Sequence, residues 1–162
     1  KEEWMHLIHK EIQGRYVLVY QIHNNPILDR YAMKFAKHVG LPLYRVSPSL
    51  HQIMRGGKFI FLPDVGEFLS YINNATYIVT DSFHGTAFSI NFNKQFIEIL
   101  PNTKTGSRNQ SILQLTGLQD RIVTDYNDFS IATKMIDYTF VNGIIKEERK
   151  KSYCILKRII EE

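Results

Sequence analysis

The chain alternates short apolar segments rich in strand-forming residues with segments of helical period, and this alternation constrains its fold more than any other feature. Each strand-like segment is almost continuously apolar, as is typical of strands with both faces covered. Strands that alternate with helices of about ten residues indicate a parallel sheet flanked by helices. The sequence therefore predicts a Rossmann-like, doubly wound α/β domain. The five main strands are expected at residues 16–21, 42–47, 58–62, 77–80 and 95–100.

Local signals mark the starts and ends of several expected helices. Asn25 and Pro26 suit the cap and the first turn of one helix, which Gly40 ends. Asp64 and Glu67 have the spacing of a capping box for the next helix. Further helices are expected over residues 1–12, 85–92, 109–118 and 129–140, with a short strand over 121–123 and a long C-terminal helix over 141–162.

The length of 162 residues fits one domain, spanning residues 1–162. Because the chain opens at Lys1 directly with a helix-like segment, we expect it to be a fragment of a longer protein. The single Cys154 excludes an internal disulfide and a cysteine zinc site. No apolar run reaches the length of a membrane span, so a cytoplasmic location is the default.

The net charge is +4, and much of the positive charge lies in residues 146–158, KEERKKSYCILKR. This segment is read as the solvated face of an amphipathic helix, with an anionic membrane surface as the alternative partner. Nucleic acid is not expected, because the aromatic residues lie in apolar runs and are not interleaved with Lys and Arg.

A polar cluster interrupts the apolar sequence at residues 80–86, TDSFHGT, where the fourth strand should end and a helix begin. Ligands of doubly wound sheets bind at the carboxyl ends of the strands, and a helix start attracts anions. Gly85 removes a side chain that would keep a ligand from the backbone, Ser82 and Thr86 add hydroxyl groups, and His84 can move a proton near neutral pH. The cluster therefore fits a pocket for phosphate or carboxylate. The alternative is structural, with Asp81 or Ser82 as a simple helix cap and His84 as a hydrogen-bonded structural residue.

Five segments between Pro63 and Val123 carry a resemblance to a known family. They are VGEFLSYINNA at 65–75, TDSFHGTAFSI at 80–90, NKQFI at 93–97, GSR at 106–108 and ILQLTGLQDR at 112–121. In this order they resemble the polysaccharide pyruvyl transferase family. Its members look like two Rossmann-like halves that face each other across a cleft, as in GT-B glycosyltransferases. On this resemblance the chain corresponds to the C-terminal half.

The resemblance implies transfer of pyruvate from phosphoenolpyruvate to a sugar of a bacterial surface polysaccharide, as a cyclic ketal and without a cofactor. His84 matches the histidine of the family motif and is expected to act as an acid or base or to contact phosphate. The backbone from Phe83 to Thr86 would hold an anion. Arg108, beside Ser107 in the loop after the fifth strand, is the candidate for a second anion clamp, with a flexible surface arginine as the alternative.

One position departs from the family pattern. In the better-understood members an arginine precedes the motif histidine by two positions, whereas this chain has Ser82 there. Phosphoenolpyruvate as donor therefore requires that Arg108 or a residue from the missing half supplies the cation. The expected partners are this anionic donor, a glycan or lipid-linked sugar acceptor, the N-terminal half and a further copy of the chain. An enzyme of this class would work in the cytoplasm, with the inner face of the membrane as a further location.

Other polar residues are weaker candidates. His23 ends the first strand and shares a sheet edge with His84, so it is a candidate substrate contact. Glu67 could also face the cleft, although a capping role explains it better. Asp81 could orient His84 or bind a sugar hydroxyl. His6 and His9 have the spacing of a shared metal site, but no third ligand is evident and no metal is expected.

Two other functions stay open at this level. The first is a GT-B glycosyltransferase half that binds the diphosphate of a nucleotide sugar at the same helix start. The second is a non-catalytic scaffold of the same fold, which the serine at position 82 favours. An ATPase or a dinucleotide oxidoreductase is disfavoured, because the sequence has neither a GKS nor a GxGxxG fingerprint.

Overall fold

The computed structural model describes residues 2–101, 106–132 and 134–161. Its centre is a five-stranded, entirely parallel sheet with the strand order β3-β2-β1-β4-β5. This arrangement confirms the predicted Rossmann-like α/β fold. The strands are β1 (Val17–Tyr20), β2 (Leu43–Ser47), β3 (Lys58–Phe61), β4 (Tyr77–Thr80) and β5 (Gln95–Glu98).

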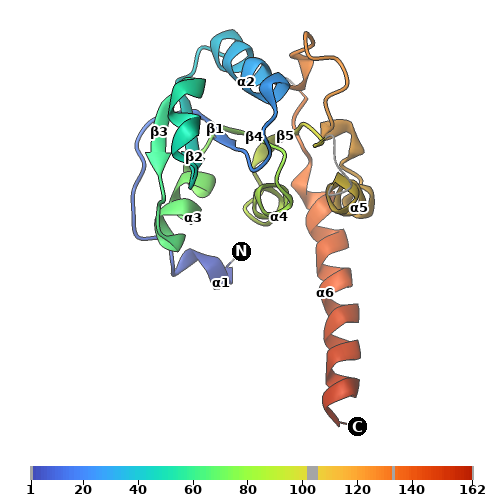
Figure 1. Ribbon diagram of the computed structural model, residues 1–162. Helices are drawn as coiled ribbons and strands as arrows, with labels where there is room; N and C mark the ends of the chain where they lie inside the picture. Colours follow the sequence, from blue (N-terminus) through green and yellow to red (C-terminus); the bar gives the residue numbers. More distant parts are fainter. Residues whose placement is uncertain (1, 102–105, 133, 162) are drawn as a thin grey trace.

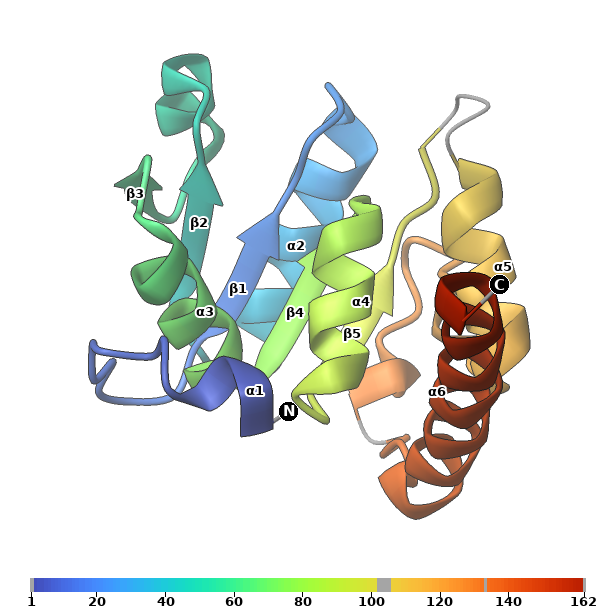
Figure 2. The same cartoon turned by 90° about the horizontal axis from the view of Figure 1, so that it is seen from below.

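Helices cover both faces of the sheet (Figures 1 and 2). One face carries α2, which packs on alternate strand residues such as Val17, Val79 and Ile97. The other face carries α3 and α4, which pack on Leu18 and Ile78. The α-helices are α1 (Glu2–Met5), α2 (Pro26–His38), α3 (Val65–Asn74), α4 (Phe83–Asn91), α5 (Gly106–Thr116) and α6 (Tyr138–Glu161), and the 3-10 helices are η1 (Leu50–Arg55), η2 (Gln119–Arg121) and η3 (Ser130–Ala132).

The predicted caps of α2 and α3 are confirmed. The side chain of Asn25 accepts hydrogen bonds from the N–H groups of Ile27 and Leu28, and Pro26 occupies the first helical position. Asp64 Oδ1 accepts from the Glu67 N–H at 2.8 Å. Both signals are local in the sequence, so the structure forms them as the residue types dictate.

Three predicted elements are wrong. The first helix ends at Met5, because the following segment crosses α3, where the Lys10 N–H donates to Ser70 Oγ. The predicted strand over 121–123 contributes only one bridge, between Ile122 and Glu98. The predicted helix over 129–140 is mostly irregular up to the start of α6, because the Arg121 guanidinium holds the carbonyl groups of Ile131 and Lys134.

The C-terminal helix α6 begins at Tyr138, three residues before the predicted start, and its far end projects away from the sheet (Figure 1). Its base packs on the core through Val141 and, in part, Ile145. Within the described residues, no helix combines the length and apolarity that a bilayer span requires. Large apolar side chains on its outer half are exposed: Tyr153, Ile155, Leu156, Ile159 and Ile160.

Candidate functional site

The strand order reverses between β1 and β4, which lie side by side in the sheet with Tyr20 paired to Thr80. The first connections leave β1 toward β2, whereas the later ones leave β4 toward β5. The two loops at the carboxyl ends of these strands therefore lead in opposite directions. In this architecture, ligands usually bind in the crevice at such a switch point. The residues that follow the two strands are 21–25 and 81–84.

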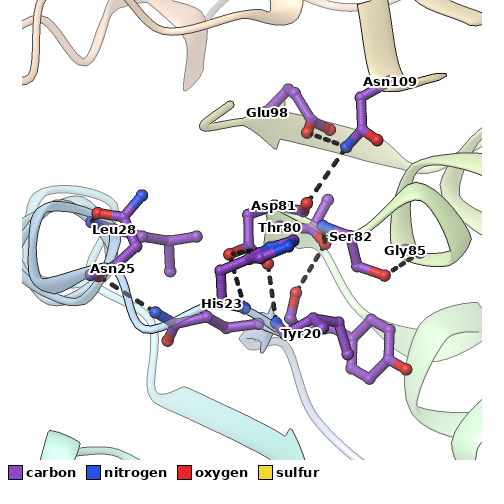
Figure 3. Close-up of polar contacts among 12 residues, drawn as sticks. Tyr20, His23, Asn25, Leu28, Thr80, Asp81, Ser82, Gly85, Glu98 and Asn109 are labelled. Carbon is purple, nitrogen blue, oxygen red and sulfur yellow. Dashed lines mark hydrogen bonds and ion pairs between the residues drawn. The ribbon is translucent and has the colours of Figure 1, made fainter. Parts of the chain in front are cut away.

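Asp81 joins the two sides of this crevice (Figure 3). Its carboxylate accepts hydrogen bonds from the Ile22 N–H at 2.8 Å and the His23 N–H at 3.1 Å. Its Oδ2 also lies 3.2 Å from Nδ1 of the His23 ring. Asp81 is only 1% exposed, and burial raises the pKa of its carboxyl group, although the bonds from Ile22 and His23 act in the opposite direction.

The contact with Asp81 fixes the His23 ring. The Asp81 carboxylate accepts a hydrogen bond from the ring, so the tautomer with its proton on Nδ1 is favoured. The other ring nitrogen, Nε2, is directed away from the carboxylate. The side chain of His23 is 30% exposed at the crevice. The structure thus brings Asp81 together with His23, and not with His84 as one reading of the sequence proposed, because the end of β4 lies beside the end of β1.

Ser82 provides the cap of α4. Its Oγ accepts from the Gly85 N–H at 3.4 Å. Among the described residues, no protein acceptor binds the N–H groups of Phe83 and His84, which belong to the first turn. Free amides and the helix dipole make this end of α4 favourable for an anion. The expected anion contact through the Gly85 amide is replaced by the Ser82 cap.

Gly85 is required by packing. A Cβ atom there would lie 2.3 Å from Oγ1 of Thr80 and 3.1 Å from the Tyr20 ring. Thr80 cannot retreat easily, because its hydroxyl donates to the Tyr20 carbonyl at 2.6 Å and accepts from the Ser82 N–H at 3.0 Å. Gly85 therefore lets α4 lie against β1 and β4, which differs from the expected role of admitting a ligand to the backbone.

His84 is exposed and lines a cavity of about 420 Å³ at the same edge of the sheet. The cavity is mainly apolar, with Phe68 and Phe88 on its sides and Ser47 and Asp64 among its polar members. Leu62 also lines it and has a φ of 42°, in the left-handed region that a branched side chain rarely adopts.

A larger hollow of about 700 Å³ lies between α4, α5 and α6 and contains none of the predicted site residues.

Arg108 lies in the first turn of α5, whereas the sequence predicted a loop, since the helix begins at Gly106. It is exposed, and its guanidinium carbon is 5.4 Å from the centre of the Phe83 ring. Arg108 therefore lies beside the first turn of α4, next to Phe83, the residue that precedes His84. Ser107 precedes it on the same exposed turn.

The structure does not place Glu67 with these residues. Its carboxylate pairs with Lys10 Nζ, and it is absent from the described lining of the cavity, whereas Asp64 is part of that lining. His9 lies 3.5 Å from Asp64 in an exposed pair. Within the described chain, no three His, Cys, Asp or Glu side chains gather in the manner of metal ligands.

Sequence reasoning missed Glu98, the last residue of β5. Its side chain is fully buried: Oε2 lies 2.5 Å from Thr86 Oγ1, and Oε1 accepts a hydrogen bond from Asn109 Nδ2 at 2.6 Å. The same Asn109 amide reaches the Asp81 carbonyl at 3.3 Å (Figure 3). The available signal was one acidic residue inside the otherwise apolar segment QFIEIL.

Taken together, the open parallel sheet and the polar side chains gathered where its strand order reverses define a Rossmann-like α/β domain with a candidate ligand site. A family model described as Polysaccharide pyruvyl transferase matches residues 5–103, more than half of the chain. The chain belongs to this family, as the sequence predicted. The match starts well before Pro63, and residues 104–123 of the predicted resemblance lie outside it. Comparisons with the curated proteins and with the solved structures gave no match.

Proposed function

We propose that the chain is the donor-binding, C-terminal half of a transferase that moves pyruvate from phosphoenolpyruvate to a sugar of a bacterial cell-surface polysaccharide. A second half completes the cleft and contributes to binding the glycan or lipid-linked acceptor. The enzyme acts in the cytoplasm, at the inner face of the membrane. The observation that carries the proposal is that the exposed His84 and two free amides belong to the first turn of α4, and that Arg108 lies beside Phe83 of the same turn.

The electrostatic demand of this donor supports the assignment. Phosphoenolpyruvate carries a phosphate and a carboxylate, so its site needs two groups that bind anions. The N–H groups of Phe83 and His84 serve one anion together with the helix dipole. The guanidinium of Arg108 serves the other through its two-pronged geometry. Arg108 thus supplies the cation that the family arginine, replaced here by Ser82, would otherwise provide.

The reaction requires two bonds to the central carbon of the enol. One acceptor hydroxyl adds to this carbon while a proton goes to the methylene carbon. The first hydroxyl gives up its proton to a base in this step. A second hydroxyl then displaces phosphate, which leaves with the bonding electron pair and takes up the proton of that hydroxyl, and the cyclic ketal forms. His84 is assigned as the acid or base nearest to the bound phosphate. His23, whose ring Asp81 holds, is assigned as a substrate contact on the opposite side of the crevice.

Thermal denaturation with ligands tests the donor. We expect phosphoenolpyruvate to raise the melting temperature of the protein, because a ligand that binds only the folded state stabilises it. Nucleotide sugars should give no shift. A shift with nucleotide sugars and none with phosphoenolpyruvate would instead assign the chain as a glycosyltransferase half.

Substitution of His84 tests the chemistry. In the complete enzyme, His84→Ala should lower kcat by about 10²-fold or more, since general acid–base groups contribute roughly 10²- to 10⁴-fold. The matched control is His38→Ala, an exposed histidine in the last turn of α2. Unchanged turnover in His84→Ala would remove this residue from the chemistry and favour another catalytic group or a scaffold.

A further inference from the structure

Glu98 is a buried acidic group that the proposed reaction does not use. Its side chain has no exposed surface, and within the described residues no Lys, Arg or His forms an ion pair with it. Its two hydrogen-bond partners are neutral: Thr86 on α4 and Asn109 on α5. Burying a charged carboxylate without a cationic partner costs much free energy. The geometry around Glu98 must therefore be compared for its ionised and its protonated form.

Counting hydrogen atoms answers this question. Thr86 Oγ1 lies 3.0 Å from the Ser82 carbonyl oxygen and 2.5 Å from Glu98 Oε2. The carbonyl can only accept, and a hydroxyl has one hydrogen to donate. Both contacts are hydrogen bonds at the same time only when Thr86 donates to Ser82 and a protonated Glu98 donates to Thr86. The remaining oxygen, Oε1, accepts from Asn109 in either state.

The electrostatic environment agrees with this count. Burial raises the pKa of Glu98 to about 7, and the negative charge of Asp81 at the end of β4 acts in the same direction. The hydrogen bonds from Thr86 and Asn109 lower the pKa in part. The other charged or titratable groups on the adjoining segments are His84 of α4, Arg108 of α5, and Asp120 and Arg121 of η2.

The two partners of Glu98 occupy equivalent places. Thr86 is the fourth residue of α4, which follows β4, and Asn109 is the fourth residue of α5, which follows β5. One carboxyl group therefore connects the first turns of the helices that carry His84 and Arg108. We propose that Glu98 is a positioning residue that carries a proton and, as a neutral acid, holds these two helix starts in the spacing that an anion requires.

Loss of the proton has a direct consequence at the site. An ionised Glu98 takes the Thr86 hydroxyl away from Ser82 and places a negative charge beneath two helix ends that attract anions. Anion binding should therefore weaken as the pH rises through 7. This part of the inference rests on the proposed anion site, whereas the protonation state of Glu98 does not.

A carboxyl carbon titration by NMR tests the protonation state. We expect the side-chain carboxyl of Glu98, assigned through its own chain neighbours, to titrate near pH 7. This signal should be absent from Glu98→Gln and unchanged in Glu11→Gln, an exposed control. Titration of the Glu98 carboxyl below pH 5 would overturn the inference, and the measurement on the unsubstituted protein needs no variant to fold.

Sulfate binding tests the positioning role, because sulfate keeps its charge across the range and leaves only the protein to titrate. Between pH 6 and pH 8 the dissociation constant should rise more in the wild type than in Glu98→Gln, with a difference on the order of several-fold. His84 is present in both proteins, so the difference isolates Glu98. Equal pH dependence in the two proteins would refute the positioning role. Absence of sulfate binding at every pH, with Glu98 still titrating near 7, would refute the proposed anion site instead.

Discussion

Two buried polar networks lie on opposite sides of β1, and they handle charge in different ways. On the β2 side, the fully buried Arg45 lies 3.0 Å from the Asp29 carboxylate and donates to Gln21 Oε1 at 2.8 Å. On the β4 side, Asp81 and Glu98 are both buried, and the second has no ion-pair partner among the described residues.

The difference in charge pairing distinguishes a network that stabilises the fold from a network of the kind found at functional sites. The Arg45 network joins β2 to α2, and the guanidinium groups of Arg45 and Arg55 lie 3.0 Å and 3.4 Å from the Asp29 carboxylate, so the buried cation faces an opposite charge within the protein. The Asp81 and Glu98 network carries acidic groups whose pKa values are raised, and it lies at the reversal of strand order. A buried acid without a compensating cation, as Glu98 is among the described residues, is typical of functional sites at such a place.

The largest expected effect comes from breaking the compensated network. Arg45→Met leaves Asp29 with one buried partner fewer and should lower the free energy of unfolding by about 3–5 kcal/mol. Urea denaturation measures this change. The control, Arg30→Met on the exposed face of α2, should stay within about 0.5 kcal/mol of wild type. A loss below about 1 kcal/mol for Arg45→Met would mean that the ion pair of the Arg45 network does not contribute the stability that distinguishes it from the Asp81 and Glu98 network.

The pH dependence of stability should reveal the uncompensated network. The pKa of Glu98 is raised from 4.5 to about 7, so between these values the folded protein holds a proton that the unfolded chain has lost. The free energy of unfolding should therefore fall as the pH rises from 4.5 to 7, by about 3 kcal/mol from this group. Urea denaturation of wild type and Glu98→Gln at pH 5, 6, 7 and 8 isolates the effect by difference. If the free energy of unfolding depended on pH in the same way in the two proteins, the expected contribution of Glu98 would be contradicted.

A smaller loss is expected when Glu98 keeps its proton but loses its partner. Thr86→Val removes the hydroxyl next to Oε2 and should cost about 1–2 kcal/mol at pH 6, because a buried polar atom is left unsatisfied. Denaturation at that pH gives the value, and Thr124→Val, at an exposed position, is the matched control. If both variants equal the wild type in stability, Thr86 does not hold Glu98.

The smallest change in stability is expected at the exposed edge of the Arg45 network, where Arg55 meets Asn24. Asn24 Oδ1 accepts from Arg55 at 2.8 Å in an exposed contact. Asn24→Ala should change the free energy of unfolding by less than about 0.5 kcal/mol, since exposed contacts contribute little. Thermal denaturation is sufficient to detect a larger change, which would show that the network extends to the surface.

The sequence predicts the elements whose causes are local. Asn25 and Asp64 cap helices through residues two or three positions away, so their roles follow from the sequence alone. The segment 129–140 fails as a prediction because its carbonyl groups are bound by the side chain of Arg121, which comes from another part of the chain. Tertiary contacts, and not the local sequence, determined the conformation of this segment.

The candidate site shows the same division. The exposed His84 and the helix start were predicted, because the motif and the strand end are adjacent in the sequence. The partners of Asp81 and Glu98 were not, since Asp81 meets His23 across 58 residues and Glu98 meets Asn109 on the following helix. Only the strand order decides these contacts, and no short pattern encodes it.

The pairing of β1 with β4 also has a consequence for how the protein is made. Both walls of the crevice depend on this pairing, and β1 is synthesised long before β4. During translation the early strands can associate, yet Asp81 has no means of reaching His23 until β4 has left the ribosome and entered the sheet. The contact between Asp81 and His23 at the candidate site is therefore made only after the late strand is in place.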